Sequence, residues 1–202
     1  MSLLFLGIFF LAIVIHEYAH GITALWLGDK SAKYAGRLTL NPLAHIDLFG
    51  TILLPLVLMI TRSPVILGWA KPVPINYWAL RNPKRDIIWV GLSGPVSNIL
   101  IAVILAIFIK AFSFLPFMVF LLKQAILTNL ILAVFNLIPI PPLDGSRVLY
   151  GILPRGLANR YTSIEPYGFL ILFALLYLVP GFFNFINSAV SILLNILKIN
   201  IY

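Results

Sequence analysis

The stretch Ile15–Gly21, which reads Ile-His-Glu-Tyr-Ala-His-Gly, is the part of the sequence around which the rest is arranged. It lies inside an apolar segment that is long enough to cross a membrane. His16 and His20 are four residues apart, so both imidazoles lie on the same face of a helix and can bind one metal ion. Glu17 between them is placed to move protons on a water bound there. Because ionisable groups inside a membrane are costly, this stretch is a candidate functional site.

The composition predicts an integral membrane protein. Of the 202 residues, 61% are hydrophobic and only 10% are charged, and the mean hydropathy is +1.05. A soluble domain of this length needs far less apolar surface. The net charge of +8 would suit a nucleic-acid-binding protein, but basic loops on the cytoplasmic side of a membrane explain it better. The chain has no cysteine, which excludes disulfides and thiolate zinc sites.

The segment Met1–Leu27 is interpreted as a retained membrane span. It has no basic region at its start and no small-residue cleavage site, so it differs from a signal peptide. Hydropathy predicts an all-α polytopic membrane protein with about five transmembrane helices, and a short helix at 146–153. The expected spans are residues 3–27, 86–112, 116–138, 164–179 and 182–199. We expect one domain over residues 1–202, with a core at 1–153 and accessory helices at 164–199.

Two segments between the first two spans are expected to differ from ordinary transmembrane helices. Residues 30–40 are polar with some alternation, and they predict a short β-hairpin region that ends in the strand Arg37–Leu40. Residues 48–60 are apolar but short and broken by Pro55, so they predict a re-entrant or interfacial segment. The loop at 63–83 is rich in proline and carries aromatic residues suited to the membrane interface: Trp69, Tyr77 and Trp78.

The basic residues predict an orientation. If residues 48–60 do not cross the membrane, 12 of the 14 basic residues fall on one side, and only Lys110 and Lys123 fall on the other. If the segment does cross, the division is 9 against 5 of the same 14. Basic loops face the cytoplasm, so we expect multi-pass insertion in the cell membrane with the amino terminus outside and the carboxyl terminus in the cytoplasm.

This topology brings the polar residues of three helices to one depth. His16 lies eleven residues before Leu27, and Asn98 lies eleven residues after Ile87, so both sit roughly 16 Å from the same face. The third long helix runs toward that face and brings Asn136 and Asp144 with it. A catalytic zinc takes three protein ligands and leaves a position for water. Asp144 is the best-placed third ligand, because the prolines at 139–142 end the helix and let it turn inward.

The same residues carry a resemblance to a known family. The chain resembles the site-2 proteases, which are intramembrane zinc metalloproteases, in a small prokaryotic form without a PDZ or CBS domain. The motifs that match are residues 16–20, residues 94–98 (Gly-Pro-Val-Ser-Asn), residues 136–145 with their Leu-Asp-Gly end, and the loop at 68–74. The resemblance implies one zinc per chain on His16, His20 and Asp144, with Glu17 as general base and Asn136 assisting the transition state or positioning substrate. It also implies cleavage of single-span membrane proteins.

Some residues have a structural as well as a functional interpretation. Asn98 either positions substrate or only caps backbone groups and packs helices. His45 is expected to stabilise a turn. Leu38 and Thr39 are candidate substrate-positioning residues, because a substrate helix must unwind before cleavage and an exposed strand edge can pair with its main chain.

Three functions remain open from the sequence. The first is an intramembrane zinc metalloprotease whose partners are lipid and single-span membrane substrates, not nucleic acid. The second is a membrane metal transporter or channel that uses the histidine pair as a transit site. The third is an inactive scaffold, which is disfavoured because no motif residue is missing. Replacing Glu17 by glutamine separates the first two, because a protease needs this carboxylate and a transit site does not.

Overall fold

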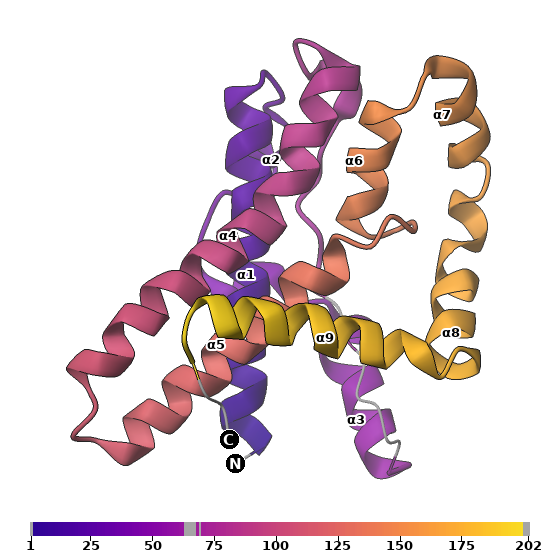
Figure 1. Ribbon diagram of the computed structural model, residues 1–202. Coiled ribbons are helices and arrows are strands. Elements are labelled where there is room, and N and C mark those ends of the chain that lie inside the picture. The colour runs from indigo at the N-terminus through magenta and orange to yellow at the C-terminus, as the bar shows by residue number, and fades with distance from the viewer. Residues whose placement is uncertain (1, 63–67, 69, 200–202) are drawn as a thin grey trace.

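The computed structural model describes residues 2–62, 68 and 70–199, and this part of the chain forms helices joined by short connections (Figure 1). The three longest helices are α1 (Ser2–Trp26), α4 (Pro83–Ala111) and α5 (Pro116–Asn136). The shorter elements are α2 (Ser31–Tyr34), η1 (Pro42–His45), η2 (Leu48–Leu53), α3 (Leu54–Ile60), η3 (Tyr77–Ala79), α6 (Asp144–Ile152), α7 (Arg155–Thr162), η4 (Glu165–Tyr167), α8 (Gly168–Leu178) and α9 (Gly181–Ile196).

The prediction of an all-α polytopic membrane protein is confirmed. The described residues include four helical segments that are long and apolar enough to cross a membrane: Leu4–Trp26, Pro83–Ala111, Pro116–Asn136 and Arg155–Leu178. Large apolar side chains such as Leu11, Leu100 and Ile107 are exposed on their outer faces, as expected where lipid replaces water.

Among the described residues, four helical segments reach spanning length, against about five expected. The expected fifth span at 182–199 corresponds to α9, which has only 16 residues and a length of about 24 Å at 1.5 Å per residue, less than a hydrocarbon core of about 30 Å. Figure 1 shows α9 running across the molecule, at a steep angle to α1 and α8. The fourth span also starts earlier than predicted, because the expected loop at 155–160 forms α7.

The expected β-hairpin at residues 30–40 is wrong. Residues 31–34 form α2 and residues 37–40 are extended without a strand partner in the described part of the chain. Side chains bond to the backbone here instead: Arg37 Nη1 donates to the carbonyl of Ala44, and His45 Nε2 donates to the carbonyl of Thr39 at 2.9 Å. Such local bonds close a turn and remove the groups that a strand ladder would need.

Residues 48–60 form two short elements, as their length suggested. The π-helical η2 is followed by α3, which contains Pro55 near its start. Together they belong to the shorter apolar helices of the described chain. Part of the loop that follows, including Trp69, lies outside the described residues, and the described remainder contains η3 and extended chain.

The element at the centre of the molecule is α4, which packs against α1, α5 and α6. Glycines allow the close contacts: a Cβ on Gly91 would lie 3.1 Å from the carbonyl oxygen of Asp144 in α6. Proline begins both α4 and α5, where its missing N–H costs nothing. The larger core cluster joins α4, α5, α8 and α9 around Ile126 and Leu130.

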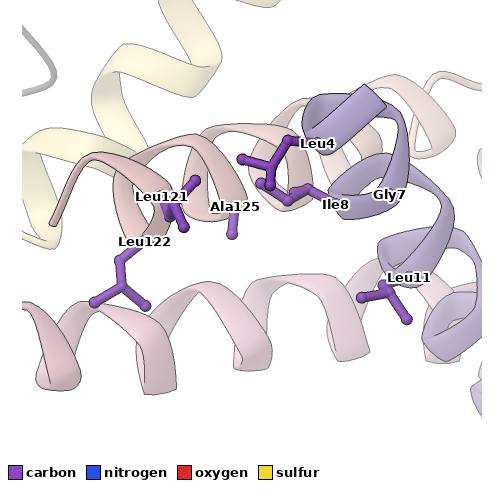
Figure 2. Close-up of a pocket in the computed structure, with 7 residues that line it drawn as sticks. All are labelled: Leu4, Gly7, Ile8, Leu11, Leu121, Leu122 and Ala125. Atoms are coloured by element: carbon purple, nitrogen blue, oxygen red, sulfur yellow. The ribbon is translucent and has the colours of Figure 1, made fainter. Parts of the chain in front are cut away.

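An apolar groove lies between α1 and α5 on the outside of the bundle (Figure 2). Its volume is about 450 Å³ and its lining is Leu4, Gly7, Ile8, Leu11, Leu121, Leu122 and Ala125.

Candidate metal centre

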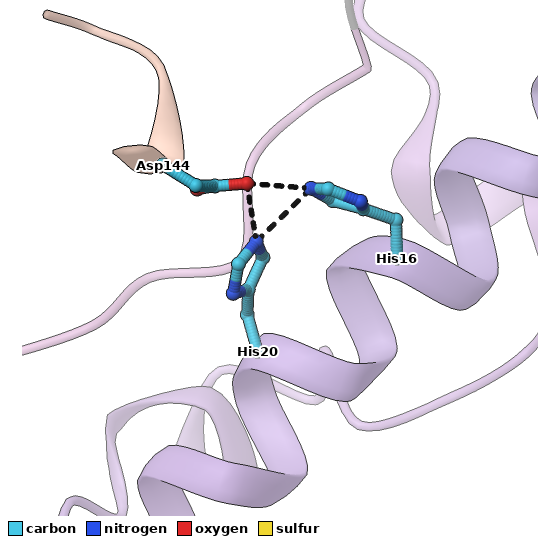
Figure 3. Close-up of side chains that lie close together, drawn as sticks. All are labelled: His16, His20 and Asp144. Carbon is cyan, nitrogen blue, oxygen red and sulfur yellow. Dashed lines mark hydrogen bonds and ion pairs between the residues drawn. The ribbon is translucent and has the colours of Figure 1, made fainter. Parts of the chain in front are cut away.

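Two histidines of α1 and one aspartate of α6 meet at a single point. Figure 3 shows the Nε2 atoms of His16 and His20 pointing at the carboxylate of Asp144. The two Nε2 atoms are 3.1 Å apart, and Asp144 Oδ2 lies 2.9 Å from His16 Nε2 and 3.2 Å from His20 Nε2. Both histidines are buried and Asp144 is half-buried. Helix periodicity places the histidines together, and the tertiary fold adds a residue 124 positions further along the chain.

Asp144 reaches the site because the chain turns tightly between α5 and α6. The turn is closed by backbone hydrogen bonds from Ile140 to Ile138 (2.8 Å) and from Leu143 to Ile140 (2.9 Å). Gly145 is required beside it, because a Cβ there would collide with the carbonyl of Leu137 and lie 2.6 Å from that of Ile138. The proline-rich end of α5 thus aims the first residue of α6 back at α1.

The outer ring nitrogens of both histidines are bound by the protein. His20 Nδ1 lies 2.7 Å from the carbonyl oxygen of Val90, which can only accept, so Nδ1 carries the proton. His16 Nδ1 lies 2.6 Å from Asn98 Oδ1. With both protons on Nδ1, both Nε2 atoms present lone pairs toward each other and toward a carboxylate oxygen.

Three electron-pair donors facing one another across about 3 Å repel unless a proton or a metal cation lies among them. Two imidazole nitrogens and one carboxylate oxygen are also a ligand set that a catalytic zinc takes. The described residues therefore fit a metal ion at this point.

Gly94 keeps the space for such an ion free. A Cβ on Gly94 would collide with His20 Nε2 and would lie 2.6 Å from both Cε1 and Nε2 of His16. Gly94 belongs to α4, and α4 packs against α1, so Gly94 lies directly beside the two rings. Glycine is needed at this position because any side chain would collide with the two imidazole rings, and not because of the backbone conformation.

Glu17 is held by the loop that precedes α4. Its Oε2 accepts a hydrogen bond of 2.8 Å from the backbone N–H of Val73. The same loop is attached to the end of α1 twice more, by Asn76 N to Asp29 Oδ2 (2.7 Å) and by Arg81 N to the carbonyl of Leu27 (2.9 Å). The loop therefore covers the helix that carries the candidate base and fixes one of its carboxylate oxygens.

The end of α1 is shaped to receive this loop. Gly28 has a φ of +116°, a value that favours glycine and ends the helix. Asp29 is fully buried and accepts from Ser31 N and Ser31 Oγ as well as from the loop. Its burial is compensated by these bonds.

Arg147 of α6 connects the site region to the fourth span. Its guanidinium lies 5.3 Å from the ring centroid of Tyr77, and Nη2 donates to Glu165 Oε1 at 2.7 Å. Burial raises the pKa of the Tyr77 hydroxyl above its ordinary value, and the positive charge of Arg147 opposes this shift. Tyr77 is therefore a neutral phenol at physiological pH.

The structure brings some predicted residues to the centre and leaves others apart. His16, His20 and Asp144 meet, and Glu17 is adjacent in sequence. Asn136 donates from Nδ2 to the carbonyl of Leu132 in its own helix at 2.9 Å, and its described hydrogen bonds do not reach His16, His20 or Asp144. Leu38 packs over α1 at Gly21, where a Cβ would lie 2.7 Å from Leu38 Cδ2.

Several residues of the site were not singled out from the sequence. Gly94 was noted only as part of a motif. Its importance comes from the close approach of α4 to the His16 and His20 rings, which only the tertiary structure shows. Val73 carries a plain apolar side chain, and the group it supplies is a backbone N–H. Asn129 is different: an amide in the middle of the apolar helix α5 was a visible signal.

Comparison with known proteins gives the family of this chain. The model of peptidase family M50 matches residues 110–179. The relatives include proteins named "Putative zinc metalloprotease". YwhC of Bacillus subtilis (strain 168) is 37% identical over 174 residues, which cover 82% of this chain and 75% of YwhC. The chain belongs to peptidase family M50.

Other relatives agree with this membership. Rip2 of Mycolicibacterium smegmatis is 31% identical over 188 residues, covering 85% of this chain and 68% of Rip2. "Zinc metalloprotease MJ0392" of Methanocaldococcus jannaschii is 27% identical over 146 residues, covering 72% of this chain and 33% of that protein. No solved structure matches the chain.

Membership of family M50 confirms the predicted resemblance to the site-2 proteases. It likewise confirms the prediction of an enzyme, a zinc metalloprotease of that kind, in a multi-pass membrane protein. The alternatives of a metal transporter and an inactive scaffold are not what the family indicates.

Proposed function

We propose that this family M50 peptidase is an intramembrane zinc metalloprotease that cleaves single-span membrane proteins. His16, His20 and Asp144 would hold one zinc ion, and Glu17 would act as general base. The observation that carries the proposal is the meeting of three lone pairs around a space kept open by Gly94. The two histidines belong to α1, a helix long and apolar enough to cross a membrane, which supports substrates of the membrane itself.

The bound zinc would polarise a water molecule and lower the pKa of that water toward neutrality. Glu17 accepts a proton from the attacking water and returns it to the amine of the leaving chain. The Val73 N–H, 2.8 Å from Glu17 Oε2, fixes which carboxylate oxygen remains available for this task. Val90 and Asn98 hold the two imidazole rings through Nδ1, so that both Nε2 atoms stay directed at one point.

Asn136 is proposed as a substrate-positioning or oxyanion-stabilising amide. Its side chain lies at the end of α5, half-buried, just before the turn that carries Asp144. Nδ2 donates one N–H to the carbonyl of Leu132, and an amide nitrogen carries a second N–H that can donate to a substrate. Leu38 and Thr39 stay predictions as substrate contacts, without the strand edge first expected.

The proposed orientation has the amino terminus outside and the basic loops in the cytoplasm. It places on the cytoplasmic side the end of α1 and the start of α4, with Arg81 in the preceding loop and Lys84 and Arg85 in the first turn of α4. A cytoplasmic carboxyl terminus, as the charge count predicts, further requires α9 to cross the membrane.

The test is zinc analysis together with a cleavage assay on the wild-type chain and on Glu17→Gln, with the protein in detergent or liposomes. We expect about one zinc per chain in both proteins, and loss of cleavage by about 100-fold or more in Glu17→Gln, since general-base catalysis contributes that much. His16→Ala should lose both zinc and cleavage. Full cleavage by Glu17→Gln would overturn the role of Glu17 as general base. Absence of cleavage by the wild-type chain, together with metal flux through liposomes that Glu17→Gln leaves unchanged, would overturn the proposal in favour of transport.

A further inference from the structure

Two buried amides lie behind the candidate metal centre. Asn98 of α4 is 0% exposed and Asn129 of α5 is 3% exposed, inside helices that are otherwise mostly apolar. A polar side chain at such a place costs free energy unless its donors and acceptors are all bound. Their hydrogen bonds therefore indicate what they do.

The two amides form one directed chain of hydrogen bonds across three helices. Asn129 Nδ2 donates to the carbonyl of Ala125, and Asn129 Oδ1 accepts from Asn98 Nδ2, both at 2.8 Å. Asn98 Nδ2 also donates to the carbonyl of Ala12 in α1 at 3.2 Å. Asn98 Oδ1 then faces His16 Nδ1 at 2.6 Å.

The direction of this chain is set at both ends by helix carbonyls, which only accept. The carbonyl of Ala125 fixes the amide of Asn129 with its oxygen toward Asn98. The carbonyl of Ala12 and that oxygen both require an N–H from Asn98, so the Asn98 amide cannot flip. Its oxygen is thereby forced toward His16, where it accepts a hydrogen bond from Nδ1–H, so that Nε2 keeps its lone pair.

We propose that Asn98 and Asn129 are positioning residues for the metal centre: Asn98 holds the tautomer and ring orientation of His16, and Asn129 holds the amide of Asn98. The inference rests on the proposed zinc site and extends that site to Asn129, which lies 31 positions beyond Asn98. In this inference Asn98 positions His16 and does not position the substrate. Outer partners of this kind change metal affinity by roughly 10- to 100-fold when they are removed.

The first arm of the test measures the affinity of the purified chain for zinc, by competition with a chelator, and the absorption spectrum of its cobalt form. We expect Asn98→Leu and Asn129→Leu to weaken zinc binding by about 10- to 100-fold. Asn129→Asp should stay close to wild type, because a neutral carboxyl group offers the same acceptor to Asn98 and the same donor to Ala125. Thr128→Val is the matched control, since Thr128 Oγ1 donates only to the carbonyl of Gln124 in its own helix.

The second arm separates positioning from a simple linking of helices. Asn98→Asp faces the His16 N–H directly, which favours the carboxylate form there, unlike at position 129. A carboxylate has two equivalent oxygens, so its acceptor for His16 needs no orientation by Asn129. We expect Asn129→Leu to cost zinc affinity in the wild-type background and much less in the Asn98→Asp background. An equal loss in both backgrounds, or no loss in the first, would overturn the inference.

The outcomes also distinguish this inference from the proposed function. If the wild-type chain binds zinc and Asn129→Leu binds it equally well, only the positioning role fails. If the wild-type chain binds no zinc and cleaves without it, both fail. Thermal unfolding of each variant in the same detergent shows whether a loss of affinity reflects the site, and Asn129→Asp keeps the test valid if the leucine variant does not fold.

Discussion

At the scale of the residue, the site depends as much on an absent side chain as on the ligands. His16 and His20 were predictable from their spacing, because four residues make one helical turn. The space between their Nε2 atoms is defined from outside α1, by Gly94 of α4. A motif of ligands alone does not reveal such a space.

Gly94→Ala is therefore expected to damage the metal centre specifically. The added Cβ would meet His16 Nε2 at 2.6 Å, and overpacking of this kind costs about 1–3 kcal/mol, or roughly 5- to 150-fold in zinc affinity. Zinc titration of the purified variant measures the effect. Gly7→Ala is the matched control, because a Cβ on Gly7 in α1 meets nothing within 4 Å. Equal zinc affinity in the two variants would show that Gly94 is not needed for the space.

At the scale of the element, the loop before α4 acts as part of the site. Val73 is buried between two prolines, and its backbone N–H reaches Glu17. The sequence predicted a loop here but not its contact, because a backbone donor leaves no trace in side-chain patterns. The wrong strand at 37–40 has a similar origin, since Arg37 and His45 satisfy backbone carbonyls there.

Val73→Pro removes this N–H and should lower the turnover of the enzyme with zinc content unchanged. A residue before proline already favours the extended region, and Pro74 follows Val73, so a proline at 73 suits the backbone. We expect kcat to fall by about 10- to 100-fold, because Glu17 loses its fixed orientation. Val73→Ala keeps the N–H and should retain most activity. Wild-type kcat in Val73→Pro would mean that this hydrogen bond has no part in the reaction.

At the scale of the whole molecule, the orientation in the membrane decides from which side a substrate reaches the site. The chain has no cysteine, so single cysteines can report the side of each loop. Trp78 is 86% exposed in the loop before α4, and Phe114 is 73% exposed in the hairpin between α4 and α5.

In intact cells, we expect an impermeant maleimide to label Phe114→Cys and to label Trp78→Cys only after permeabilisation. The expectation follows from the basic residues near Trp78, which favour the cytoplasm. The opposite pattern would reverse the proposed orientation. Asn195→Cys near the end of α9 tests the carboxyl terminus separately: labelling only after permeabilisation requires α9 to cross the membrane.

Patterns in the sequence were enough to predict the membrane environment of this protein, its helical class and the residue types of the candidate metal site. Apolar runs and a four-residue histidine spacing are local properties, and each follows from the period and length of a helix. Asp144 was also predictable, because the prolines before it must end α5.

The contacts between distant elements could be seen only in the tertiary structure. Three packed helices direct the amides of Asn98 and Asn129, the approach of α4 sets the space at Gly94, and a loop bond fixes Glu17. It also turned the last apolar segment across the bundle. These features depend on the direction of hydrogen bonds and on distances between elements far apart in the chain, and neither quantity has a period that a sequence can display.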